Sequence, residues 1–153
     1  MSTSALLLAA AQMNGHVTSV DISPSNYEPP VHLQTHYTFK QQNSLAFLQG
    51  LPHDEMFDLV FIDDLHLKQH VETELSLLEP HLTNQSIVLM HDTLPGYMDS
   101  KDGGPYEALA SLRKDEWEFA TIPVCQGLTL LRKLYSVRRG RHNVAIHLTG
   151  AYL

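Results

Sequence analysis

The stretch FDLVFIDDLH, residues 57–66, decides the fold of this sequence. Its first six residues hold five apolar side chains and one charged one, Asp58. A strand with one face in water alternates apolar and polar residues, whereas a strand covered on both faces is nearly all apolar. The run ends in Asp63 and Asp64. We therefore expect a buried strand over 57–64 with a polar carboxyl end, as in a parallel sheet with helices on both faces.

Helical and extended patterns alternate on both sides of this strand. Apolar residues spaced by four, four and three predict an amphipathic helix over 64–79, and Pro80 ends it: Leu67, Val71, Leu75 and Leu78. Further strands are predicted over 16–23, 37–41 and 86–92, and further helices over 2–15, 43–51 and from Pro105 onward. The runs 118–124 and 128–134 predict a closing antiparallel hairpin. The pattern predicts a mostly parallel α/β sheet in one domain over 1–135, followed by a basic tail over 136–153.

Composition and charge exclude several classes of protein. Apolar residues make up 43% of the 153 and charged residues 18%, which excludes a disordered chain and a collagen-like repeat. No apolar run approaches the roughly 20 residues of a membrane span, so no membrane partner is expected. A single cysteine, Cys125, allows neither an internal disulfide nor a cysteine-based zinc site, and it favours a reducing cytoplasmic location. The net charge of −7 disfavours nucleic acid as a partner and leaves a homo-oligomer open.

Three aspartates each stand at the carboxyl end of a predicted strand: Asp21, Asp63 and Asp92. Ligands of open α/β sheets bind outside the carboxyl ends of the strands. A carboxylate there can accept ribose hydroxyls, position a cation or hold a substrate. One such aspartate is more often a helix cap or a turn former, but that explanation weakens when three strands share the feature.

Three segments resemble a known family: HVTSVDISP (16–24), FDLVFIDDLH (57–66) and EPHLTNQSIVLMHDTLPG (79–96). Together they are similar to class I S-adenosylmethionine-dependent methyltransferases. The closest similarity is to the small-molecule O-methyltransferases of the macrocin and cephalosporin-hydroxylase-like branch, with catechol-type enzymes more distant. The resemblance spans roughly residues 2–134. It implies a Rossmann-like sheet, S-adenosylmethionine as cofactor and methyl transfer to a hydroxyl of a small-molecule acceptor.

The resemblance also implies site residues. Asp21 matches the acid that binds the cofactor ribose, and Asn43 and Ser44 match a pair near the adenine. Ser2 and Thr3 begin the helix that follows the glycine-rich loop of the family. Asp63 matches the acid beside the reacting methyl group and counts among the cofactor-binding and catalytic residues.

On the acceptor side, the resemblance places His91 and Asp92 with Asp63 as catalytic residues. Asp63 and Asp92 would hold a divalent cation such as magnesium, for which carboxylate oxygens are suited. His91 or His66 would act as general base, because a histidine titrates near neutral pH. For His91, a packed histidine at the strand end is an equal alternative.

The sequence departs from the family at its start. The first strand and glycine-rich loop of the family precede the helix that begins here at Ser2 and Thr3. We therefore expect an N-terminally truncated domain whose sheet lacks its first, central strand. Such a chain should be marginally stable, bind its cofactor weakly and be inactive.

Three alternatives stay open. His66, His70 and Glu74 are spaced by four residues, so they could hold a transition metal on one helix face, although a solvated face is the commoner arrangement. Asp21 would also suit the ribose of NAD, but the sequence contains no G-x-G-x-x-G. The chain could also be a non-catalytic remnant that binds a nucleoside cofactor and is completed by a partner.

Overall fold

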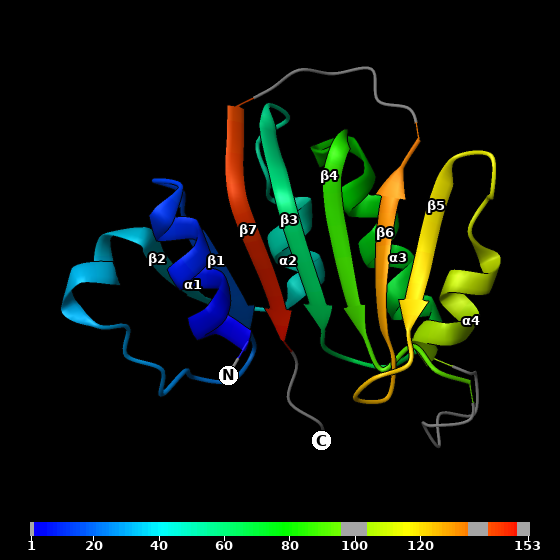
Figure 1. Ribbon diagram of the computed structural model, residues 1–153, viewed down its shortest axis with the longest axis horizontal. Helices are drawn as coiled ribbons and strands as arrows, with labels where there is room; N and C mark the ends of the chain where they lie inside the picture. The colour runs from blue at the N-terminus through cyan, green and yellow to red at the C-terminus, as the bar shows by residue number, and fades with distance from the viewer. Residues whose placement is uncertain (1, 96–103, 135–140, 150–153) are drawn as a thin grey trace.

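The computed structural model describes residues 2–95, 104–134 and 141–149. They form one sheet with helices packed on it (Figure 1). In chain order the elements are α1 (Ser2–Gln12), β1 (Val17–Asp21), the 3-10 helix η1 (Val31–His36), β2 (Tyr37–Gln41), α2 (Ser44–Gln49), β3 (Glu55–Asp63), α3 (Lys68–Leu78), η2 (Glu79–His81), β4 (Leu82–His91), α4 (Gly104–Ser111), β5 (Trp117–Ile122), β6 (Leu128–Lys133) and β7 (Arg141–Thr149).

The sheet has seven strands in the order β2-β1-β7-β3-β4-β6-β5. The pairs from β2 to β4 are parallel, and β6 runs antiparallel to both β4 and β5. Helix α1 lies on one face, and α2 and α3 lie on the other (Figure 1). The predicted α/β architecture, with its closing hairpin over β5 and β6, is confirmed.

The centre of the sheet departs from the sequence-based prediction. The central position, which we expected to lack a strand, is filled by β7, which lies between β1 and β3 and is parallel to both. Ile146 pairs with Thr18 on one side and Val60 on the other. The prediction of a tail over 136–153 is therefore wrong for Arg141–Thr149. The strand was missed because its apolar part is short, contains His147 and follows a basic segment, whereas burial between two strands outweighs those local signals.

The core packs against β3, as the apolar run at 57–62 predicts, and also against β7. Val60, Ile146 and Leu148 are fully buried, together with Leu78 of α3. A second, smaller cluster lies beneath α1 and is formed by Leu7, Ala10, Val17 and Leu33. Among the helices described, none has the length and apolar character of a membrane span.

Helix α3 begins four residues later than the pattern predicted. The sequence predicted a start at Asp64, but the helix starts at Lys68. Leu65 and Leu67 are exposed, whereas Val71 and Leu75 are buried. Residues 64–67 therefore form a separate connection at the end of β3, and this shift decides where His66 and His70 lie.

Candidate functional site

Parallel pairing brings the predicted site residues to one edge of the sheet. The carboxyl ends of β1, β7, β3 and β4 meet at that edge. The register pairs Val20 with Leu148 and Asp63 with Thr149, so Asp21 and Asp63 end the two strands that flank β7. Strand order also reverses here, because β1 leads to β2 on one side and β3 leads to β4 on the other. Ligands of open α/β sheets bind at such a switch point.

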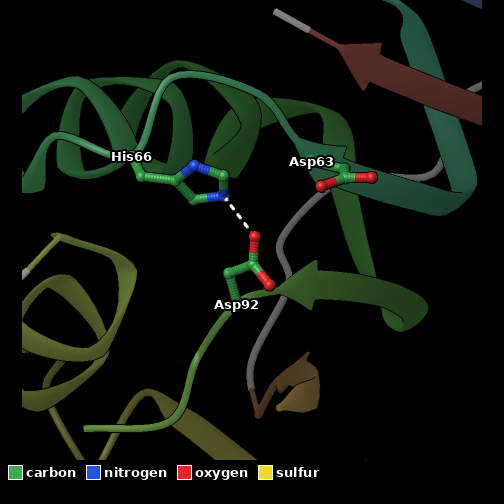
Figure 2. A group of neighbouring side chains, drawn as sticks. All are labelled: Asp63, His66 and Asp92. Carbon is green, nitrogen blue, oxygen red and sulfur yellow. Dashed lines mark ion pairs between the residues drawn. The ribbon is translucent and has the colours of Figure 1, made fainter. Parts of the chain in front are cut away.

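Two acids and two histidines meet at the ends of β3 and β4. His66 Nε2 lies 3.1 Å from Asp92 Oδ2 (Figure 2). His91 Nδ1 lies 2.9 Å from Asp92 Oδ1 and 3.5 Å from Asp63 Oδ1. His66 and Asp92 are buried, whereas Asp63 and His91 are partly open to solvent. Asp63, His66 and Asp92 each offer one ligand atom within 4.8 Å of the others, so the spacing suits a cation.

Asp92 adopts a backbone conformation that turns the chain sharply at the end of β4. Its φ is +54°, in the left-handed region that aspartate tolerates better than most residues. The turn brings the following residues against the β5–β6 hairpin, where Leu94 N donates to Gln126 O at 2.9 Å and Thr129 Oγ1 donates to Thr93 Oγ1 at 2.7 Å. The hairpin thereby supports the segment that positions the Asp92 carboxylate.

The charge balance of this site disfavours a further negative charge. Burial raises the pKa of the Asp63 carboxyl above its ordinary value, and the nearby charge of Asp92 adds to the increase. The proximity of His91 opposes both effects. A positively charged group placed between Asp63 and Asp92 would therefore relieve their mutual repulsion.

The residues predicted for the cofactor divide into two groups. Asp21 Oδ1 accepts a hydrogen bond from Ser23 N at 2.8 Å and stays half-buried. Exposed Asn43 caps α2, its side chain accepting from Leu45 N and Ala46 N at 3.0 and 3.2 Å. These two side chains lie at the same edge as Asp63.

The side chains of Ser44 and Thr3, also predicted for the cofactor, are engaged in contacts within the protein. The Ser44 hydroxyl is buried and donates to Asp64 Oδ2 at 3.0 Å, on the inner side of α2. Thr3 Oγ1 lies 3.1 Å from His147 Nδ1 of β7. The side chain of Ser2 is outside the described residues.

His66, His70 and Glu74 do not share one helix face, so that prediction is wrong. Because α3 begins at Lys68, His66 lies before the helix and turns to Asp92. His70 and Glu74 lie on α3 and meet Asp64 instead. Nor is their surface solvated, since the exposed fraction is 0% for the Glu74 side chain and 12% for His70.

The protonation of this second cluster is strongly perturbed. A hydrogen bond with Asp64, together with the nearby Glu74, raises the pKa of His70 to about 10. Burial raises the pKa of Glu74 to about 7. Burial is the largest influence on Asp64 and acts to raise its pKa, but the hydrogen bonds with His70, Glu74 and Ser44, together with the charge of His70, leave that pKa below its ordinary value.

His147 is a residue of this edge that sequence reasoning missed, because it lies in the segment read as a tail. Its ring stacks on Phe61 with centroids 5.0 Å apart and planes 15° apart. The side chain is buried, and burial lowers its pKa to about 4. An alternation of apolar residues around it, Val144, Ile146 and Leu148, was the available signal.

The pKa of His147 predicts a loss of stability in acid. Because the folded pKa lies below that of the unfolded chain, the unfolded state binds more protons between about pH 6.5 and 4. Stability attributable to this residue is complete above that window and falls by up to about 3 kcal/mol across it. Urea unfolding of the wild type and His147→Gln at several pH values measures the difference. The exposed His32→Gln is the matched control, and a His147→Gln profile parallel to the wild type would contradict the prediction.

Comparisons with known proteins agree with this architecture. The sequence profile of a family described as "Methyltransferase domain" matches residues 1–93. No curated protein sequence matches the chain. Among solved structures, a Corynebacterium glutamicum protein has a TM-score of 0.58 at 16% identity, over 90% of this chain and 83% of that one.

Two further solved structures share the fold. A putative caffeoyl-CoA O-methyltransferase from Staphylococcus aureus has a TM-score of 0.54 at 13% identity, over 84% of this chain and 81% of that one. A Podospora anserina methyltransferase with bound SAH has a TM-score of 0.51 at 11% identity, over 84% and 76%. The family profile covers most of the chain, and it includes the ends of β1, β3 and β4 that carry Asp21, Asp63 and Asp92. The chain belongs to this family of S-adenosylmethionine-dependent methyltransferase domains.

Proposed function

We propose that this chain transfers the methyl group of S-adenosylmethionine to a hydroxyl of a small molecule. The observation that carries the proposal is the convergence of Asp63, His91 and Asp92 beside the switch point, with Asp21 across the end of β7. This arrangement separates a carboxylate suited to a ribose from a histidine–carboxylate group suited to an acceptor.

The cofactor side rests on Asp21, whose carboxylate can accept hydrogen bonds from both ribose hydroxyls. Asn43, exposed at the start of α2, lies at the same edge and can border the adenine. Thr3 and His147 lie at the start of α1 and the end of β7, where they support the methionine side of the site. S-adenosylmethionine supplies the methyl group on its sulfonium when bound.

His91 is the general base in this proposal. Its Nδ1 faces the carboxylates of Asp92 and Asp63, which stabilise an imidazolium and fix the orientation of the ring. The other ring nitrogen is left to accept the proton of the acceptor hydroxyl as the oxygen attacks the methyl carbon in line with the departing sulfur. Methyl transfer depends mainly on this alignment, so positioning supplies much of the rate.

We propose Asp63 and Asp92 as the protein ligands of a divalent cation such as magnesium, because one oxygen of each lies within 4.8 Å of the other. Among the described residues, His91 Nδ1 is the ion-pair partner of the buried Asp92 Oδ1 at 2.9 Å, and no hydrogen bond is directed at that oxygen. A cation held there would lower the pKa of the acceptor hydroxyl and orient its oxygen.

A cavity next to Asp92 suits a small acceptor. It measures about 370 Å³ and begins at Thr93, the residue after Asp92. Tyr106, Leu109 and Phe119 make its wall largely apolar, and Lys114 and Thr121 add polar groups. Pockets of this size enclose small organic molecules.

The test is formation of S-adenosylhomocysteine by the purified chain with a panel of small hydroxylated acceptors, with and without magnesium. The proposal expects turnover with at least one hydroxylated acceptor and none with the matched amines. Methylation of amines alone would contradict the hydroxyl assignment, and reduction of NAD would favour the nicotinamide alternative.

A further inference from the structure

A second polar cluster lies beneath the candidate site, on the other side of the β3 end. Asp63 ends β3 and Asp64 follows it outside the strand, and their side chains contact different groups. Asp63 turns to the His91 group, whereas Asp64 turns to Ser44 of α2 and to His70 and Glu74 of α3. The cluster therefore joins three separate elements.

Four ligand-type atoms lie close together in this cluster. His70 Nε2 lies 3.1 Å from Asp64 Oδ2, 3.3 Å from Ser44 Oγ and 3.4 Å from Glu74 Oε1. Ser44 Oγ lies 3.0 Å from Asp64 Oδ2. A tetrahedral zinc ion with ligands at about 2.0–2.1 Å sets those ligands roughly 3.3 Å apart. The observed separations are close to that spacing.

Hydrogen bonds alone do not satisfy these atoms. The two shortest contacts, from Ser44 Oγ at 3.0 Å and His70 Nε2 at 3.1 Å, both go to the same atom, Asp64 Oδ2. Among the described residues, none donates a hydrogen bond to either oxygen of Glu74 or to Asp64 Oδ1. The Glu74 side chain is fully buried and extends toward His70. A buried carboxylate without a partner is costly unless it is neutralised or coordinates a metal.

We propose that Asp64, His70 and Glu74 bind a divalent transition metal ion such as zinc, with Ser44 as the fourth neighbour. Two carboxylates balance the charge of the ion, and one imidazole together with carboxylate oxygens is a ligand set that zinc accepts. The ion ties α2 and α3 to the end of β3 and thereby fixes the strand end that carries Asp63. This proposal does not depend on the methyl acceptor or on magnesium at Asp63.

The experiment measures zinc bound to the purified chain. The protein is treated with chelator, reloaded with zinc, dialysed and analysed for metal by mass spectrometry, and the affinity is measured by calorimetry. Asp92→Asn disables the His66–Asp92 group and serves as the matched background, because it leaves Asp64, His70 and Glu74 intact. Glu74→Gln keeps the volume of the side chain and removes the ligand.

We expect one zinc ion per chain in the Asp92→Asn background and a loss of affinity of about 100-fold or more when Glu74→Gln is added. Zinc should raise the Tm of Asp92→Asn, and chelator should reverse the increase. When Asp92→Asn is loaded with Co²⁺, its visible absorption spectrum should show the bands of a tetrahedral Co²⁺ site. This measurement does not require the Glu74 variant to fold. Absence of zinc from folded Asp92→Asn, or zinc retained after Glu74→Gln, would overturn the proposal.

Discussion

Replacing Ile146 with aspartate is expected to prevent this protein from folding. Ile146 is fully buried in β7, paired with Thr18 of β1 and Val60 of β3. The substitution removes the buried isoleucine side chain and places an unpaired carboxylate in the centre of the sheet, where its desolvation is costly. The expected decrease in the free energy of unfolding exceeds about 4 kcal/mol. That cost is a large share of the roughly 5–15 kcal/mol that stabilises a typical domain.

Circular dichroism and thermal unfolding of Ile146→Asp measure the effect. Val31→Asp is the matched control, because Val31 is 83% exposed and its substitution introduces the same charge. The control should keep a cooperative transition near that of the wild type. If Ile146→Asp also unfolded cooperatively at the wild-type Tm, β7 would not be the central strand.

His91→Gln is expected to reduce kcat for methyl transfer by about 10²–10⁴-fold, the usual contribution of a general base. The imidazole faces Asp63 and Asp92, and an amide at this position cannot take up the acceptor proton. The affinity for S-adenosylmethionine should change little, because Asp21 lies across the end of β7 from His91.

Steady-state kinetics of the wild type and His91→Gln, with the acceptor identified in the hydroxyl panel, measure the change in kcat. His53→Gln is the matched control, since His53 is exposed and lies before β3, at the opposite edge of the sheet. If the kcat of His91→Gln stayed within a few-fold of the wild-type value, another group would have to remove the proton of the acceptor.

Most of the fold was predictable because local patterns and tertiary burial agree there. The apolar run of β3 and the alternation of strands and helices give the sheet its parallel character, and the position of each strand-end aspartate follows from the same pattern. Asp63, His91 and Asp92 could be grouped from sequence because parallel strands align their carboxyl ends.

The sequence was misleading where a long-range contact outweighs a local signal. Strand β7 lies beside β1 and β3, far apart from it in sequence, and no local pattern indicates that pairing. The start of α3 depends on the connection after β3, so the spacing of His66 and His70 suggested a shared helix face that does not form. Ser44 matched an adenine-binding position, but its hydroxyl is engaged by Asp64, which the spacing along the chain does not reveal.

Calorimetric titration of S-adenosylmethionine into the purified chain tests the central claim most directly, namely that the cofactor binds at the end of β7 between Asp21 and Asp63. Weak binding was expected of a sheet without its central strand; because β7 fills that position, we expect S-adenosylmethionine to bind and NAD not to bind. Asp21→Asn should weaken the binding by about 10-fold or more, since a lost charge-assisted hydrogen bond costs about 1.5–3 kcal/mol. Asp54→Asn, an exposed site before β3, should keep the wild-type affinity. Folded protein that ignores S-adenosylmethionine, or that binds it equally well after Asp21→Asn, would contradict the account.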